Sequence, residues 1–352
     1  MGTHTGAVRV QWQPETVLIT GATGFVGGNL AARLVAMGAN VISIERDYRP
    51  LNTLSALRVR DLVTTVKGDV TDLSLMQRVF AEYNVTYVFH FAAQALMSTA
   101  IRDPVSTFET NIKGTWVTLE AARVTPTLKG FVVASSDKAY GDQRRLPYGE
   151  SLPLLDRYPY GASKVCVDTL AQCYHVTYGL PVAIARSSNI YGPGDLNFSR
   201  LVPGAIGCGL TNETLKLRSN GEIRRDYLYV HDAIDGYAAL AEGLGQGAHA
   251  GETFNFGAGS AHSVLDLCQL IAKLTGSSGN LEVASGAGSE APEQYLDIQK
   301  AREQLSWRPR TSFERGLTQT IAWYREFLEF GNEHATAGDR DRHFASSLGT
   351  KH

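Results

Sequence analysis

The residue types best suited to chemistry gather in two short stretches of this chain. Phe131-Val-Val-Ala-Ser-Ser-Asp-Lys138 is an apolar run that ends in a hydroxyl, a carboxylate and an amine. Tyr160-Gly-Ala-Ser-Lys164 then places a phenol and an ammonium about one helical turn apart, on one face of a helix. Such groups build a poor core but can move protons and a hydride. The candidate catalytic residues are therefore Ser136, Asp137, Lys138, Tyr160 and Lys164.

A glycine-rich stretch near the start of the chain predicts a dinucleotide site. Thr20-Gly-Ala-Thr-Gly-Phe-Val-Gly-Gly28 follows a predicted strand and opens a predicted helix. Its glycines permit a tight turn, close approach of a pyrophosphate and close helix–strand packing, and the helix N-terminus attracts the phosphates. The alternative is a glycine-rich turn without a ligand. The cofactor contacts expected here are Gly21, Thr23, Gly24, Phe25, Val26 and Gly27.

The choice between NAD and NADP depends on the end of the second predicted strand. Glu45 lies there, and an acidic residue at this position usually binds the adenosine ribose hydroxyls, which favours NAD. Arg46, a second expected contact, or Arg49 could instead hold the 2′-phosphate of NADP. We therefore expect NAD, with NADP the less favoured alternative.

Two later strand ends supply further expected cofactor contacts. Asp69 and Val70 follow the third strand, where a carboxylate can accept the adenine amine. Asp69 could alternatively cap the helix predicted from Leu73. Small residues after the fourth strand would let the cofactor lie close to the backbone, within the segment Phe91, Ala92 and Ala93.

A phenol has a pKa of ~10, too high for a base at neutral pH. We expect Lys164 and a positive nicotinamide ring to lower the pKa of Tyr160. Tyr160 could then accept a hydroxyl proton while hydride leaves the same carbon, and Ser136 would orient that hydroxyl. The alternative, a surface pair on a helix, does not explain the neighbouring motifs.

These groups need a scaffold, and the N-terminal half provides alternating strand and helix patterns. Short apolar runs predict strands at Thr16–Thr20, Val41–Ile44, Leu62–Val66, Tyr87–Phe91, Phe131–Ala134 and Val182–Ala185. Helical periodicity lies between them, at Gly27–Met37, Leu73–Tyr83, Pro104–Arg123 and Tyr158–Tyr178. This alternation predicts an α/β fold with a Rossmann-type, doubly wound parallel sheet.

The rhythm changes after Tyr191-Gly-Pro-Gly194, where glycine and polar residues become frequent. We expect a cofactor domain over residues 1–191, with segments of about 227–257 returning to it. Residues 192–330 should mainly form a smaller α/β substrate domain, followed by a polar tail at 331–352.

Composition excludes several classes of function for these 352 residues. The net charge of −2 argues against a nucleic-acid partner, and no Lys/Arg run or long apolar stretch indicates a membrane. The four cysteines form no CxxC pair or His/Cys cluster, so neither disulfides nor a metal site are expected. We therefore expect a soluble cytoplasmic protein.

Taken together, these motifs resemble the nucleotide-sugar branch of the extended short-chain dehydrogenase/reductase family. The resemblance runs from Val17 to about Phe330. Besides the residues above it includes Asn111, which it places at the cofactor, and the motifs Arg186-Ser-Ser-Asn-Ile-Tyr-Gly192, Arg225-Asp-Tyr-Leu-Tyr-Val-His-Asp232 and Trp307-Arg-Pro309. Family members often pair two long helices between subunits, so the resemblance also implies a homodimer through Pro104–Arg123 and Tyr158–Tyr178.

Within this branch the residues after Ser136 distinguish the reactions. Sugar 4,6-dehydratases carry Asp-Glu there, the CDP-glucose type carries Asp-Lys, and this chain has Asp137-Lys138. The resemblance implies that Lys138 removes the C5 proton while Asp137 protonates the departing C6 hydroxyl. Alternatively, Lys138 and Asp137 form a structural ion pair. The competing functions are a nucleotide-sugar 4-epimerase, which uses the same Tyr160 and Lys164, and a non-catalytic NAD-binding regulatory protein.

The resemblance also implies a set of substrate contacts. Arg225 matches the arginine that commonly grips the substrate diphosphate, with Arg224 as the alternative. Arg200 borders the nucleotide base or is a solvated loop charge. The full set of expected substrate contacts is Gln94, Asn189, Arg200, Leu201, Val202, Arg225 and Tyr227.

Overall fold

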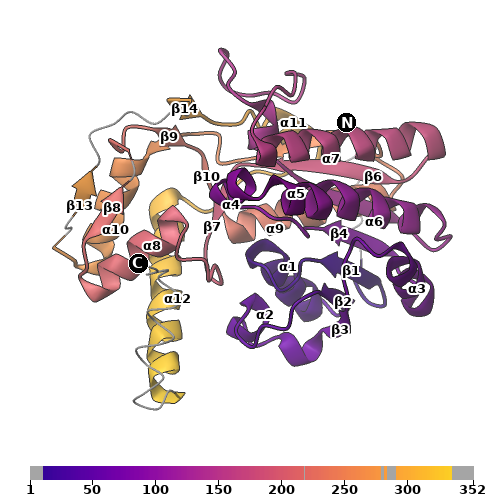
Figure 1. Ribbon diagram of the computed structural model, residues 1–352, viewed down its shortest axis with the longest axis horizontal. Helices are drawn as coiled ribbons and strands as arrows, with labels where there is room; N and C mark the ends of the chain where they lie inside the picture. The colour runs from indigo at the N-terminus through magenta and orange to yellow at the C-terminus, as the bar shows by residue number, and fades with distance from the viewer. Residues whose placement is uncertain (1–10, 218, 279–280, 284–290, 335–352) are drawn as a thin grey trace, which may run out of the picture.

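The computed structural model describes residues 11–217, 219–278, 281–283 and 291–334. Within that part of the chain, seven strands form one parallel sheet in the order β11-β6-β5-β4-β1-β2-β3 (Figure 1). This confirms the predicted Rossmann-type arrangement. The strands are β1 (Thr16–Thr20), β2 (Asn40–Glu45), β3 (Thr64–Lys67), β4 (Tyr87–His90), β5 (Gly130–Ser136), β6 (Val182–Ser187) and β11 (Thr253–Phe256).

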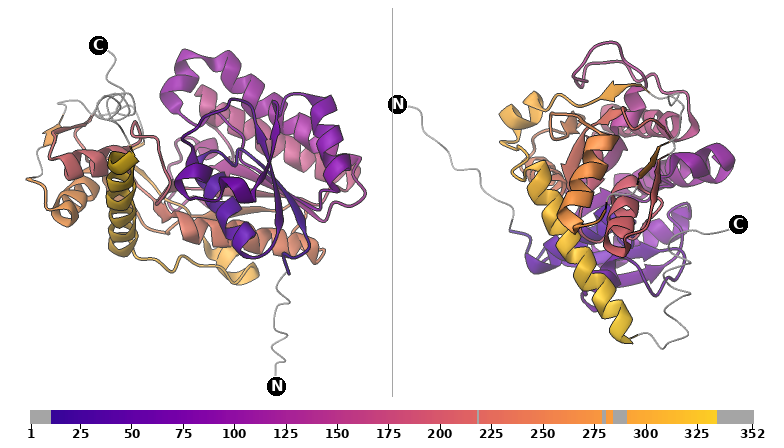
Figure 2. Two further views of the ribbon diagram at one scale, coloured as in Figure 1. Left: turned by 90° about the horizontal axis from the view of Figure 1, so that it is seen from below. Right: turned by 90° about the vertical axis from the view of Figure 1, so that its left-hand side faces the viewer.

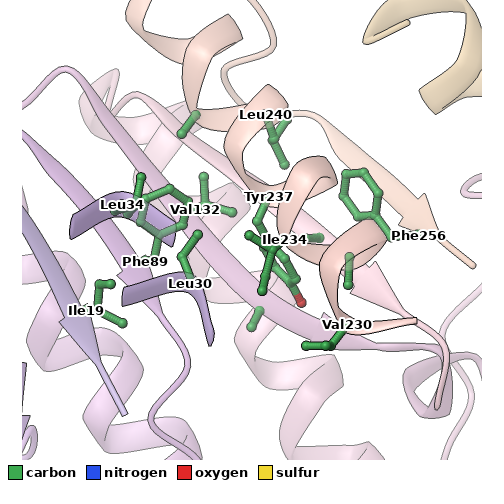
Figure 3. Packing of buried hydrophobic residues seen from close by; sticks show 14 of the residues in the cluster. Ile19, Leu30, Leu34, Phe89, Val132, Val230, Ile234, Tyr237, Leu240 and Phe256 are labelled. Atoms are coloured by element: carbon green, nitrogen blue, oxygen red, sulfur yellow. The ribbon is translucent and has the colours of Figure 1, made fainter. Parts of the chain in front are cut away.

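Helices cover both faces of this sheet, which is why its central strands are buried and mostly apolar. One face carries α3 (Leu73–Tyr83), α6 (Gly114–Arg123) and α7 (Pro159–Tyr178). The other carries α1 (Phe25–Ala36) and α9 (Val230–Gly245). Figure 3 shows side chains of these two helices meeting those of the strands, among them Leu30, Leu34, Ile234, Tyr237, Phe89 and Val132.

The helix predicted over Pro104–Arg123 contains a wider turn at its centre. It consists of α5 (Pro104–Phe108), a π-helical turn (Glu109–Lys113) and α6. Such turns often mark functional positions, and this one carries the buried Asn111. Short elements complete this half of the chain: α2 (Thr53–Ala56), α4 (Met97–Arg102) and 3₁₀ turns at Arg60–Leu62 and Asp137–Tyr140.

A second group of elements packs around a core of its own beside the sheet. It comprises α8 (Leu201–Thr211), α10 (Val264–Thr275) and α12 (Phe313–His334), which lie together away from the sheet (Figure 2). Its strands are short: β7 (Asn189–Tyr191) with β10 (Tyr227–Tyr229), β8 (Leu215–Leu217) with β13 (Leu281–Val283), and β9 (Arg224–Arg225) between β12 (His262–Ser263) and β14 (Glu293–Gln294).

The segments expected to return to the large sheet do so unequally. Strand β11 pairs with β6, and α9 packs on β5 and β6, whereas β10 pairs only with β7. The last described helices are α11 (Gln299–Gln304), beside β11, and α12, which continues three residues past Gly331. The rest of the predicted tail, 335–352, lies outside the described residues. None of the described helices combines the length and apolarity that crossing a membrane requires.

We predict that Gly21→Ala destabilises the fold. Gly21 has φ of +76°, and an added Cβ would lie 2.8 Å from the backbone N of Ala92. The left-handed strain and the clash should together lower the free energy of unfolding by at least about 2 kcal/mol, measured by urea denaturation. Gly149→Ala is the matched control, because no atom lies within 4 Å of its added Cβ. Equal stability of the two variants would contradict the prediction.

Candidate active site

The phenol and ammonium are presented by the first turns of α7. Pro159 occupies the first position of the helix, Tyr160 follows, and Lys164 lies one turn later. Lys164 is 6% exposed, and its Nζ donates to the carbonyl of Ala134 at 2.7 Å. This bond ties α7 to β5 and holds Tyr160 near the end of that strand.

Ser136 ends β5 and shapes the turn that carries the other candidate groups. Its Oγ accepts from the Lys138 backbone N–H at 3.2 Å, capping the 3₁₀ turn, and donates to Asp137 Oδ1 at 3.0 Å. Asp137 is buried, and among the described residues its Oδ2 has no hydrogen-bond partner. A buried carboxylate oxygen without a partner is unusual and is available to a substrate.

Lys138 points toward the second group of elements. Its Nζ donates to Gln294 Oε1 at 2.7 Å and lies 3.9 Å from Asp137 Oδ2. Lys138, Gln294 and Arg225 line one cavity of about 320 Å³. The sequence analysis missed Gln294, because it lies 156 residues from Lys138 and belongs to no motif.

Burial sets the titration of the Tyr160–Lys164 pair. It lowers the pKa of Lys164 from 10.5 to about 8, partly offset by the carboxylate of Asp168. Burial also raises the pKa of Tyr160 to about 12, although its interaction with the Ser136 side chain partly lowers it. The expectation that Lys164 and a nicotinamide ring together lower the pKa of Tyr160 stays a prediction, because the value of about 12 belongs to the chain alone, where burial dominates.

The glycine-rich loop has the form that a dinucleotide requires. Gly21 packs against the backbone of Ala92, and an added Cβ on Gly27 would lie 2.5 Å from the Gly21 carbonyl oxygen. Helix α1 begins after Gly24, and no side chain of the described residues caps it, so its first N–H groups are open to a phosphate. The remaining loop residues lie at the helix start: Thr23, Phe25 and Val26.

Glu45 provides an independent sign of an adenosine ribose. It is buried at the end of β2, and its Oε2 accepts from Arg60 Nη2 at 2.9 Å. Its Oε1 has no partner among the described residues, so it can accept a ribose hydroxyl. Arg46 is exposed and paired with Asp47 at 2.8 Å, which leaves the carboxylate as the nearer recognition group.

The sequence predicts that Asp69 either contacts the cofactor or caps the helix that begins at Leu73, and the structure excludes the second role. Asp72, rather than Asp69, caps α3 by accepting from the Leu75 N–H, whereas Asp69 accepts from Thr71 N–H in the loop. Val70 is buried against Gly114 of α6. Asp69 is thus half-buried beside the sheet edge and remains a predicted cofactor contact.

Asn111 and Gln94 form a bonded pair behind the loop that follows β4. Asn111 Oδ1 accepts from the Gln94 N–H at 2.7 Å, and its Nδ2 donates to the Gln94 carbonyl and to Ser163 Oγ. Gln94 Nε2 donates to Leu96 O. Both side chains therefore hold the loop that contains Ala92 and Ala93, and their direct ligand contacts remain predictions. Phe91 packs edge-on against Tyr237, with 4.8 Å between the centroids of the two rings.

Of the seven expected substrate residues, Arg225 lines the cavity of Lys138 and Gln294, and the other six are not among the described residues that line it. Arg225 is buried, and its Nη1 donates to Ala291 O at 2.8 Å, whereas Arg224 is more exposed and pairs with Glu293. Arg225 is therefore the better placed of the two arginines. Asn189 donates to the carbonyl of Asp226.

Arg200 stands at the start of α8 with its guanidinium on Asp195 at 3.1 Å, which does not fit a solvated loop charge. Leu201 and Val202 follow it in the first turn of α8. Tyr227 is buried and stacks on Phe313.

A buried polar network that the sequence analysis missed supports α7. Arg186 Nε donates to Asp168 Oδ2 at 2.6 Å, and its Nη1 donates to Tyr140 Oη at 2.9 Å. Tyr140 in turn donates to Asn255 Oδ1 at 2.8 Å. Asp168 lies one turn beyond Lys164, so this network fixes the same helix face that presents the ammonium.

Comparisons with known proteins show which family this chain is similar to. A family model described as GDP-mannose 4,6 dehydratase matches residues 18–320. A dTDP-glucose 4,6-dehydratase of Xanthomonas campestris is 32% identical over 332 residues, covering 88% of this chain and 93% of that protein. A CDP-glucose 4,6-dehydratase of Salmonella typhimurium is 30% identical over 333 residues, covering 90% and 92%.

Solved structures of other proteins have a similar overall fold. A dTDP-glucose 4,6-dehydratase of Streptomyces venezuelae with NAD bound has a TM-score of 0.81 at 29% identity, covering 90% of this chain and 98% of that one. A UDP-glucose 4-epimerase of Thermotoga maritima with UDP-glucose has a TM-score of 0.82 at 28% identity, covering 89% and 99%. The overall fold is thus equally similar to a dehydratase and to an epimerase.

We predict that Lys164→Met removes a pH-dependent term from stability. Since the folded-state pKa of Lys164 is about 8 and the unfolded value is 10.5, the unfolded chain binds more protons between these limits. Wild-type stability relative to Lys164→Met should therefore rise by about 3 kcal/mol from pH 8 to 10.5. Urea unfolding across this range measures it, with Lys→Met at the exposed Lys273 as background. A pH-independent difference would contradict the assignment.

Proposed function

The chain belongs to the GDP-mannose 4,6 dehydratase family, and from this premise we propose that it is an NAD-dependent nucleotide-sugar 4,6-dehydratase, a lyase. The observation that carries the proposal is the joining of two groups of residues at the end of β5. Ser136, Tyr160 and Lys164 suit a hydride step, and Asp137 with Lys138 suits an elimination. An epimerase has no need of the second group.

The residues present fit NAD as the cofactor. The open N-terminus of α1 would hold the pyrophosphate, Glu45 Oε1 would accept the adenosine ribose, and Lys164 lies beside Tyr160 at the reacting end. Several related structures contain NAD, among them the Streptomyces venezuelae dehydratase. When bound, NAD⁺ would supply a positive ring that can accept hydride from C4 of the sugar, and its reduced form would supply the hydride for C6.

Tyr160 carries out the first proton transfer. Its Oη accepts the C4 hydroxyl proton, while Ser136 orients that hydroxyl by a hydrogen bond. Burial raises the pKa of Tyr160 to about 12 in the chain alone, so ionisation of the phenol has to be coupled to the arrival of positive charge. Oxidation at C4 produces a 4-keto sugar whose carbonyl acidifies the C5 proton.

Asp137 and Lys138 then carry out the elimination. Lys138 Nζ takes the C5 proton, the freed electron pair forms the C5–C6 double bond, and the C6–O bond breaks. The Asp137 carboxyl gives its proton to the departing hydroxyl, which leaves as water. The ammonium of Lys138 returns a proton to C5 when C6 is reduced. One water is lost from the sugar, and there is no net oxidation.

The substrate is a nucleoside diphosphate hexose in this proposal. Arg225 would grip the diphosphate with its forked guanidinium, as the cavity shared with Lys138 supports. The Asp137-Lys138 pair favours a CDP-glucose-like substrate, while Arg200, Leu201 and Val202 at the start of α8 would border the nucleotide base. The second group of elements, which packs around its own core with α8, α10 and α12 and lies mainly within 192–330, would form the substrate-binding part.

A homodimer and a cytoplasmic location complete the proposal. Apolar side chains are exposed on the helix Pro104–Arg123, with Val105 at 71% and Trp116 at 37%, and Val176 is exposed on the neighbouring α7. Exposed apolar side chains are unfavourable in water, and contact with a second copy of the chain would bury them. All four cysteines are free thiols, which fits a reducing compartment.

We predict that incubation with CDP-, UDP-, GDP- and dTDP-glucose yields a 4-keto-6-deoxy sugar from at least one of them. The keto product and the loss of water are detected by mass spectrometry, and a C4 epimer without keto product would refute the dehydratase assignment. Lys138→Met should bind NAD normally and lose elimination by about 10²-fold or more, because the C5 base is missing. Tyr160→Phe should also lose the preceding oxidation at C4.

We also predict that the double variant Val105→Glu, Trp116→Glu is monomeric. Two carboxylates per subunit would be buried without partners at the proposed interface, raising the dimer dissociation constant by about a hundredfold or more. Sedimentation equilibrium measures the change. Leu62→Glu, at an exposed apolar position in the 3₁₀ turn Arg60–Leu62, is the control and should leave the association unchanged. A wild-type monomer would refute the dimer.

A further inference from the structure

Gln294 lies against Asp137 and Lys138, the two residues proposed to carry out the elimination (the elimination pair), and the function proposed above gives it no role. We propose that Gln294 is a positioning residue that holds Lys138 away from Asp137, so that the amine and the carboxyl act on different carbons of the sugar. The inference rests on the proposed dehydratase function. It concerns what keeps two neighbouring proton-transfer groups from bonding to each other instead of to the sugar.

The carboxamide of Gln294 makes one bond to each of the two residues. Its Oε1 accepts from Lys138 Nζ at 2.7 Å, and its Nε2 donates to the backbone carbonyl of Asp137 at 3.0 Å. The opposite orientation of the amide would set a donor against an ammonium and an acceptor against a carbonyl. The bonds therefore fix which atom faces which partner.

The separation of the charged groups follows from the first of these bonds. Lys138 Nζ lies 3.9 Å from Asp137 Oδ2, so the two groups form the ion pair that the sequence analysis left open, but without a hydrogen bond between them. In the described part of the chain that oxygen has no hydrogen-bond partner. A direct bond between them would be charge-assisted and strong. It would engage both the oxygen that must reach C6 and the nitrogen that must reach C5. A neutral acceptor holds the amine without adding a second negative charge.

Gln294 is itself held rigidly, although it comes from a two-residue strand. It is 4% exposed, and β14 pairs in parallel with β9, where Gln294 is opposite Arg225. The backbone N–H of Asp226 donates to the Gln294 carbonyl at 3.1 Å, and Asp226 Oδ2 accepts from Leu296 N–H at 3.2 Å. The residue that orients Lys138 is therefore the strand partner of the arginine proposed to grip the diphosphate.

The decisive variant is Gln294→Met, which keeps the length of the side chain and removes both bonds. We expect kcat for formation of the keto product to fall by about 10²-fold, with KM for the nucleotide sugar within about twofold because Arg225 remains. In a single turnover, oxidation at C4 should proceed at the wild-type rate, while exchange of the C5 proton with deuterated solvent should be slowed by the same factor as kcat. A purely structural role would instead lower NAD affinity and thermal stability.

Two further variants make the result interpretable. Gln299→Met, the same change at an exposed position of α11, should match wild type in every step. Gln294→Glu keeps the size and the acceptor but pairs Lys138 with a carboxylate, so it should also oxidise at C4 and lose C5 exchange. It decides the question if Gln294→Met does not fold.

Wild-type C5 exchange in either Gln294 variant overturns this inference and leaves the dehydratase assignment standing. Absence of keto product from the wild-type enzyme with all four nucleotide sugars overturns both.

Discussion

The hydrogen bond from Lys164 Nζ to the carbonyl of Ala134 is the constraint on which the site depends. A buried ammonium is unfavourable unless it is bonded, so α7 cannot shift along β5 without breaking this contact. Ala134 lies two residues before Ser136, and Tyr160 lies one turn before Lys164. The single bond therefore sets the phenol at the level of the strand end, where the hydroxyl of Ser136 is also fixed.

A second buried network keeps that bond in place from the opposite side. Asp168, one turn after Lys164, is paired with Arg186 of β6, whose guanidinium also lies over the ring of Tyr140 at 4.8 Å. Removing one partner of such a pair leaves an uncompensated buried charge and typically costs about 3–5 kcal/mol. Helix α7, strand β6 and the turn after Ser136 are thereby locked to one another, and the carboxylate of Asp168 also favours the charged form of Lys164.

What the sequence predicted well is local in the chain. The glycine loop, the strand ends and the Tyr160–Lys164 spacing each follow from a few neighbouring residues, and the parallel, doubly wound sheet follows from the alternation of strand and helix patterns. The exceptions are non-local. Gln294 meets Lys138 across 156 residues, β10 chooses β7 over the large sheet, and the pKa of Tyr160 moves upward because burial is a property of the whole fold.

The contrast between local and non-local features also bears on how one fold can catalyse two reactions. The chain is as similar in structure to an epimerase as to a dehydratase, with TM-scores of 0.82 and 0.81, so the sheet and its helices do not determine the outcome. The residues proposed for the hydride step are carried by β5 and α7, within the large sheet and its covering helices. The elimination pair is also held by Gln294 of β14. Its position therefore depends on how the substrate-binding elements pack against the large sheet. Under the proposed roles, a change of reaction within this fold would need few substitutions after Ser136, together with a matching support from a strand far away in the sequence.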